Sequence, residues 1–97
     1  MEKTVEAYLR KRVKAAGGLA LKLVCPGWTG VPDRLSLMPG ARVYFAETKD
    51  LGEKPRPRQR YVHDRLRALG FIVFVPDSKT AVDDLIREVT GNCERKI

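Results

Sequence analysis

The stretch from Val31 to Asp50, VPDRLSLMPGARVYFAETKD, constrains the fold more than any other part of the chain. Apolar residues recur on both sides of its central Pro-Gly pair, which is typical of two antiparallel strands joined by a short turn. A loop of Pro39-Gly40-Ala41 would place Leu37 opposite Val43. A two-residue Pro-Gly turn would shift this register by one residue, but Pro-Gly favours a type II turn, which splays a tight hairpin. The three-residue loop is therefore predicted.

This register brings three charged side chains together. Asp33 lies opposite Glu47, and Lys49 lies two residues further along the same side of its strand. They share one face with the apolar residues of the hairpin, Leu35, Leu37, Val43 and Phe45. Two carboxylates at this spacing repel each other unless a cation lies between them, and oxygen ligands suit Mg²⁺ or Mn²⁺. We expect a metal site here, although solvated charges at strand ends remain the alternative.

The rest of the chain predicts helices and strands in a regular order. Helices are expected at 2–16, at 59–69 with an apolar stripe of Tyr61, Val62, Leu66 and Leu69, and at 78–89 with Ser78 as N-cap and Gly91-Asn92 as the end. Strands are expected at 19–24 and 71–75. The run FIVFV between Gly70 and Pro76 predicts an interior strand. The order predicts an α/β fold with a mixed sheet flanked by helices, in one domain of residues 1–97 whose last five residues fray.

The charge balance points to a polyanionic partner. Lys and Arg number 19 against 12 Asp and Glu, which gives a formal charge of +7. The basic residues gather in two clusters, which we expect to position a nucleic-acid backbone. These are Lys54, Arg56, Arg58 and Arg60 in the first cluster and Arg10, Lys11 and Lys14 in the second. A solvated basic surface without a ligand is the alternative.

Cysteine spacing and hydropathy exclude several classes of protein. Cys25 and Cys93 stand far apart without a CxxC pair or clustered histidines, which argues against a disulfide framework and a zinc site and favours free thiols. The first residues contain no apolar segment typical of a signal peptide, and no apolar run approaches the length of a membrane span. We therefore expect an intracellular, soluble protein.

Further polar residues are placed where they could reach the predicted metal site. Glu6 lies beside the apolar stripe of the first helix, Val5, Leu9 and Val13, so a third carboxylate could reach the site. Gln59 opens the second helix, with His63 one turn later on the same face. Trp28 precedes Asp33 in a loop, where it could stack on an unpaired base or simply pack.

These residues together resemble a known family. The segments GVPDRLSL, VYFAETK and LGFIVFVPDS, with Glu6 and Gln59, are similar to the PD-(D/E)XK nuclease superfamily, and within it to the stand-alone virus-type replication-repair nucleases, the VRR-NUC family. The similarity extends from Glu2 to Val89. It implies a restriction-endonuclease-like αβββαβα core.

The resemblance also implies roles for individual residues. Asp33, Glu47, the main-chain carbonyl of Thr48 and Glu6 would hold the metal, Lys49 would act on the attacking water, and Gln59 would be a supporting polar residue. A related exonuclease branch has Gln-x-x-x-Tyr where this chain has Gln59 to His63, which leaves the role of His63 open.

Members of the family are metal-dependent DNases, so the expected protein is a Mg²⁺- or Mn²⁺-dependent deoxyribonuclease in the cytoplasm of a bacterium or a phage-infected cell. The small members look most like Holliday-junction resolvases, which implies a structure-selective endonuclease that cuts branched DNA as a homodimer. A non-catalytic DNA-binding module with the same fold and an RNA-acting nuclease are the alternatives.

Overall fold

The computed structural model describes residues 1–94, and it describes side-chain surroundings up to Thr90. The elements follow the predicted order: α1 (Glu2–Ala15), β1 (Leu19–Lys22), β2 (Arg34–Met38), β3 (Arg42–Ala46), α2 (Pro57–Ala68), β4 (Ile72–Phe74) and α3 (Lys79–Glu94). The predicted α/β class with a mixed sheet and flanking helices is confirmed.

The last helix differs from the prediction at its end. Ser78 caps it as expected, because its Oγ accepts a hydrogen bond from the Ala81 amide at 3.1 Å. However, α3 continues through Gly91-Asn92 to Glu94, so the predicted end was wrong. A glycine inside a helix costs about 1 kcal/mol relative to alanine, which weakens a helix without ending it. The fraying predicted for residues 93–97 is wrong for 93 and 94, which are helical, and otherwise lies outside the described residues.

The sheet has the order β1-β2-β3-β4, with β4 parallel to β3 and the other neighbours antiparallel. The predicted hairpin register is confirmed, because Leu37 pairs with Val43 and Leu35 with Phe45. Gly40 and Ala41 in the connecting loop have φ angles of 83° and 60°. Alanine rarely adopts a positive φ, so the loop holds Ala41 in a strained conformation.

The strand β4 lies at an edge of the sheet, so the prediction of an interior strand was wrong. Val73 is buried at 6% exposure, but Phe71 and Ile72 remain 42% and 46% exposed. An apolar run indicates only that a strand could be covered on both faces, whereas its place in the sheet depends on which strands pair with it. Periodicity alone therefore could not place this strand.

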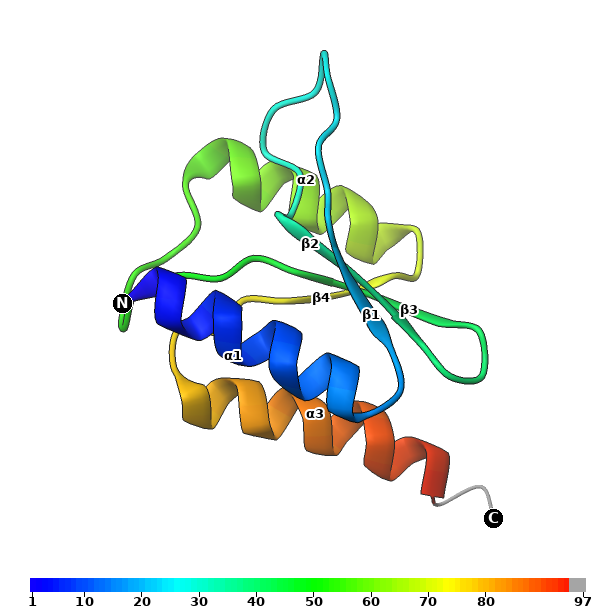
Figure 1. Cartoon of the computed structure of the whole chain (residues 1–97). Coiled ribbons are helices and arrows are strands. Elements are labelled where there is room, and N and C mark those ends of the chain that lie inside the picture. Colours follow the sequence, from blue (N-terminus) through cyan, green and yellow to red (C-terminus); the bar gives the residue numbers. More distant parts are fainter. Residues whose placement is uncertain (95–97) are drawn as a thin grey trace.

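Helices cover the two faces of the sheet unequally. Figure 1 shows α1 and α3 side by side on one face and α2 on the other. The core lies on the first face, between α1, α3 and the sheet, and consists of Val5, Leu9, Val13, Met38, Tyr44, Ala46, Val82, Leu85, Ile86 and Val89. The predicted stripe of α1 is therefore buried. In the predicted stripe of α2, by contrast, Val62 is buried while Tyr61 and Leu69 are exposed.

The same asymmetry decides which hairpin residues are buried. Arg34, Ser36 and Met38 face the α1 and α3 side and are buried, whereas Leu35 and Leu37 are only partly covered. The more apolar face of the hairpin is thus the less buried one. Two helices cover the face with the polar residues, and α2 alone covers part of the other. No helix in residues 1–94 is long and apolar enough to cross a membrane.

Candidate active site

The two central carboxylates lie where the hairpin strands end. The last pair of the hairpin ladder is Arg34–Ala46, and Asp33 and Glu47 are the next residues in that register. The Asp33 carbonyl accepts a hydrogen bond from the Leu23 amide at 3.0 Å, and the Glu47 amide donates to the Phe74 carbonyl at 2.9 Å. Main-chain bonds to both neighbouring strands therefore fix the backbone that carries these side chains.

The surroundings of the Glu47 carboxyl disfavour its ionised form. Burial, and then the charge of Asp33, raise its pKa from 4.5 to about 7, while the charge of Lys49 opposes this change. Burial also raises the pKa of Asp33, against hydrogen bonds from the Thr48 backbone and hydroxyl. The charges of Asp33 and Lys49 both act on Glu47, and the hairpin register places Asp33 opposite Glu47, so these three side chains belong to one site. Lys49 itself is 6% exposed.

Two oxygen atoms in this site have no protein partner. Asp33 Oδ1 and Glu47 Oε1 are buried and accept no hydrogen bond from any described group. Buried carboxylate oxygens normally have donors, and two neighbouring carboxylates normally avoid sharing a site without a cation. The residues present thus fit a divalent cation. Thr48 follows Glu47 directly, is fully buried, and donates its hydroxyl to Asp33 Oδ2 at 3.3 Å.

Glu6 lies near this site but is bound to a different partner. Its Oε1 is 3.1 Å from the guanidinium of Arg34, a buried residue that also donates to the Ala20 carbonyl at 3.4 Å. The charge of Glu6 nevertheless raises the pKa of Asp33. Sequence reasoning did not find this ion pair. The two residues are far apart in the sequence, and nothing in the local pattern of either indicates the other.

The helix α2 closes the site from the other side. Gln59 donates from Nε2 to Glu47 Oε2 at 3.4 Å, and its Oε1 accepts from the Arg56 amide at 2.9 Å. His63 is 1% exposed, with Nε2 3.8 Å from Glu47 Oε1. Burial, and then the charge of Arg67, lower the pKa of His63, so the imidazole is neutral at pH 7. Both predicted α2 side chains therefore face Glu47.

The seven basic residues predicted to position nucleic acid are all exposed. Lys54, Arg56, Arg58 and Arg60 lie in the loop before α2 and in its first turn, next to Gln59, and Arg10, Lys11 and Lys14 lie on α1. The guanidinium of Arg58 lies 5.0 Å from the centroid of the Trp28 ring. The first cluster thus continues directly from the helix turn that contacts Glu47.

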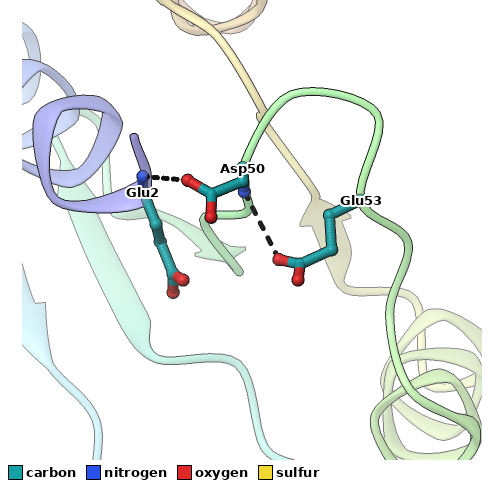
Figure 2. Close-up of side chains that lie close together, drawn as sticks. All are labelled: Glu2, Asp50 and Glu53. Atoms are coloured by element: carbon teal, nitrogen blue, oxygen red, sulfur yellow. Dashed lines mark hydrogen bonds between the residues drawn. The ribbon is translucent and has the colours of Figure 1, made fainter.

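A second group of carboxylates lies at the surface nearby. In the described chain, Glu2, Asp50 and Glu53 bring three carboxylate oxygens within 4.8 Å of one another, which Asp33, Glu47 and Glu6 do not. Figure 2 shows the Glu2 amide bonded to the Asp50 carboxylate and the Asp50 amide bonded to Glu53 Oε1, the latter at 3.4 Å. All three side chains are exposed, so water and salt screen their repulsion. Sequence reasoning did not find this group.

Comparison with known proteins identifies the family. A protein of Acyrthosiphon pisum secondary endosymbiont phage 1, named "Putative nuclease p44", is 47% identical over 78 residues, which cover 80% of this chain and 84% of that protein. A solved structure described as "VRR_NUC domain" matches with a TM-score of 0.86 at 41% identity, over 89% of this chain and 94% of that chain. No family model matches the sequence. The fold that carries the carboxylate site matches that solved structure over most of both chains, and the sequence matches the phage nuclease, so the chain belongs to the VRR-NUC family of nucleases.

Proposed function

We propose that this protein is a metal-dependent deoxyribonuclease, formed by residues 1–97 as one domain. The observation that carries the proposal is the pair of carboxylates of Asp33 and Glu47 beside Lys49, each of which has one buried oxygen without a protein partner. Without a bound cation, this pair of carboxylates would destabilise the fold at neutral pH, because the pKa of each group is raised above its ordinary value. Binding of a divalent cation offsets that cost and gives the arrangement a chemical use.

The ligands of the cation would be Asp33, Glu47 and the main-chain carbonyl of Thr48. When bound, Mg²⁺ or Mn²⁺ supplies Lewis-acid stabilisation of the negative charge on the phosphate. Glu6 completes the acidic cluster at longer range, since Arg34 holds its carboxylate by a contact of 3.1 Å. Gln59 fixes the orientation of Glu47 through its hydrogen bond at 3.4 Å.

Lys49 supplies the remaining charge of the site. Its ammonium is a compact positive charge on a side chain that is largely shielded from solvent, so its field acts strongly on its surroundings. We assign it the role of orienting the attacking water and stabilising the charge that develops on the phosphate. Neutral His63 lies behind Glu47 and limits the carboxylate's freedom to move.

The substrate is proposed to be branched DNA cut by a homodimer. One site in each chain hydrolyses one phosphodiester bond, so symmetric cutting of a junction requires two copies related by a two-fold axis. The exposed basic residues of α1 and of the loop before α2 would guide the backbone toward Lys49.

A cleavage assay tests this proposal. Purified protein is incubated with flap, splayed, linear duplex and four-way DNA in Mg²⁺, Mn²⁺ or EDTA. We expect cutting of at least one branched substrate with metal present and no turnover in EDTA. Robust cutting in EDTA would refute the metal mechanism, and equal cutting of linear duplex would refute the preference for branches. A single-stranded RNA, compared with a single-stranded DNA of the same sequence, shows whether the protein distinguishes ribose from deoxyribose.

A further inference from the structure

Four side chains form an alternating ladder of aromatic rings and guanidinium groups on the surface beside the site. The Arg58 guanidinium carbon lies 5.0 Å from the centroid of the Trp28 ring and 5.1 Å from that of the Tyr61 ring. The Arg65 guanidinium carbon lies 5.9 Å from the Tyr61 centroid, and Arg65 donates to the Tyr61 hydroxyl at 3.0 Å. We call Trp28, Arg58, Tyr61 and Arg65 the stacking ladder.

The ladder is held in place by contacts between two distant segments. Arg58 Nε donates to the Thr29 carbonyl at 3.0 Å, which ties the loop after β1 to the first turn of α2. Gly30 packs so closely on this turn that an added Cβ would lie 2.7 Å from the Arg58 carbonyl oxygen. Figure 1 shows this loop, in cyan, rising beside α2. The loop is therefore seated on the helix rather than free.

The rings of the ladder remain open to solvent. Trp28 is 48% exposed and Tyr61 is 47% exposed, although aromatic rings stabilise a protein most when their surface is buried. Cation–π pairs at an exposed site add little stability, so packing alone does not account for two half-exposed rings. Flat rings alternating with planar cations offer what an unpaired nucleotide binds, a stacking surface for the base and positive charge for the phosphate.

The ladder is also connected to both sides of the active site. Its loop leads into Asp33, which lies five residues after Trp28 and thus within about 18 Å of it along the chain. Its helix carries Gln59 and His63, which face Glu47 on an adjacent side of α2. A strand that stacked on the ladder would therefore have a phosphate a few nucleotides away in reach of the site.

We propose that the stacking ladder binds unpaired nucleotides of DNA and selects substrates in which a single-stranded segment adjoins the phosphate to be cut. A paired duplex keeps its bases stacked on each other and offers the ladder only phosphates. This inference rests on the proposed function, because it takes the nearby site of Asp33, Glu47 and Lys49 to be the place where DNA is cut. Binding to the ladder itself requires neither metal nor cleavage.

The first experiment uses the fluorescence of Trp28, the one tryptophan in the sequence. The wild-type protein is titrated in EDTA with a short oligothymidylate and with a blunt hairpin duplex that carries the same number of phosphates. We expect saturable quenching by the single strand and little change with the duplex. Equal responses to both, or no response to the single strand while binding is detected by polarisation, would overturn the inference.

The second experiment compares variants by fluorescence polarisation, again in EDTA. Trp28→Leu and Tyr61→Ala are expected to weaken single-strand binding between about 5-fold and 100-fold and duplex binding less than about 2-fold. Arg58→Lys keeps the positive charge but loses the planar guanidinium, so it should also weaken the binding of single-stranded DNA. Tyr61→Phe keeps the ring and loses only the hydroxyl that accepts from Arg65, so it should bind the single strand more tightly than Tyr61→Ala does. Phe71→Ala removes an exposed ring outside the ladder and should bind as the wild type.

Unchanged single-strand affinity in Trp28→Leu and Tyr61→Ala, or equal losses on both DNAs, would overturn the inference. If Trp28→Leu fails to fold, the comparison of Tyr61→Ala with Tyr61→Phe decides. The outcomes separate the two proposals. If the wild type binds single strands through the ladder but cuts no substrate, the nuclease proposal alone is refuted. If it cuts DNA with metal present but the ladder variants bind single strands as the wild type does, this inference alone is refuted.

Discussion

Replacing Glu47 by glutamine should stabilise the metal-free protein while it abolishes cleavage. Burial and the charge of Asp33 raise the pKa of this carboxyl from 4.5 to about 7. A raised carboxyl pKa means that the folded protein holds its proton more tightly than the unfolded chain does. The contribution to stability is therefore present below pH 4.5 and is lost as the pH rises toward 7 and beyond.

The magnitude follows from the two pKa values. At about 1.36 kcal/mol for each pKa unit, the raised pKa of Glu47 lowers the free energy of unfolding, relative to low pH, by roughly 1 kcal/mol at pH 5 and by roughly 3 kcal/mol at pH 8. The pKa of His63 is lowered, so its own contribution is lost in the opposite direction, as the pH falls below 6.5. Subtracting wild type from Glu47→Gln removes that shared background.

The assay is urea unfolding in EDTA at pH 5, 6, 7 and 8. We expect the stability advantage of Glu47→Gln to grow by about 2 kcal/mol over this range. At pH 8, Mg²⁺ at ten times its Kd should add about 1.4 kcal/mol to the wild type and nothing to the variant. Glu88→Gln, at an exposed position of α3, is the matched control and should show no trend. A difference between Glu47→Gln and wild type that does not change with pH would refute the reasoning.

Three further predictions concern neighbouring residues. Lys49→Ala should lower the cleavage rate at least about 100-fold while DNA binding in EDTA changes less than about 2-fold, and a parallel loss of binding would contradict the assigned role. Arg34→Met leaves Glu6 without its partner and should lower the free energy of unfolding in urea by about 2 kcal/mol, with part of the loss recovered when Glu6→Gln is added. Ala41→Gly should raise the unfolding free energy by about 0.5 kcal/mol, because relief of the positive φ exceeds the added entropy of the unfolded chain, and a loss of stability would show that the loop is not strained.

Local patterns were sufficient for the hairpin. The register of β2 and β3 depends on alternation within each strand and on the conformation of one loop, and all of this information lies within twenty residues. The same register places Asp33 beside Glu47, so the centre of the candidate site could be predicted from the sequence. The helices could be predicted for the same reason, apart from two ends. The α2 helix begins at Pro57 rather than at Gln59, because proline is tolerated in the first turn of a helix, and α3 continues past Gly91, where packing outweighs the weak local cost of a glycine.

Contacts between distant segments could not be predicted in this way. The pairing of Glu6 with Arg34 and the ladder of Trp28, Arg58 and Tyr61 depend on how α1, the loop after β1 and α2 pack against the sheet. Nor could the sequence place β4 at the edge, because an apolar strand has the same pattern at either position.

The sequence by itself determined the element order, the hairpin register and the likeness to VRR-NUC proteins, because each of these rests on residues close together or on quoted motifs. Only the tertiary structure decided which carboxylates lack partners, which residue holds Glu6, and which aromatic rings stay open to solvent. The physical reason is that periodicity specifies the direction of a side chain within its own element. Burial and pairing depend on the elements that pack against it.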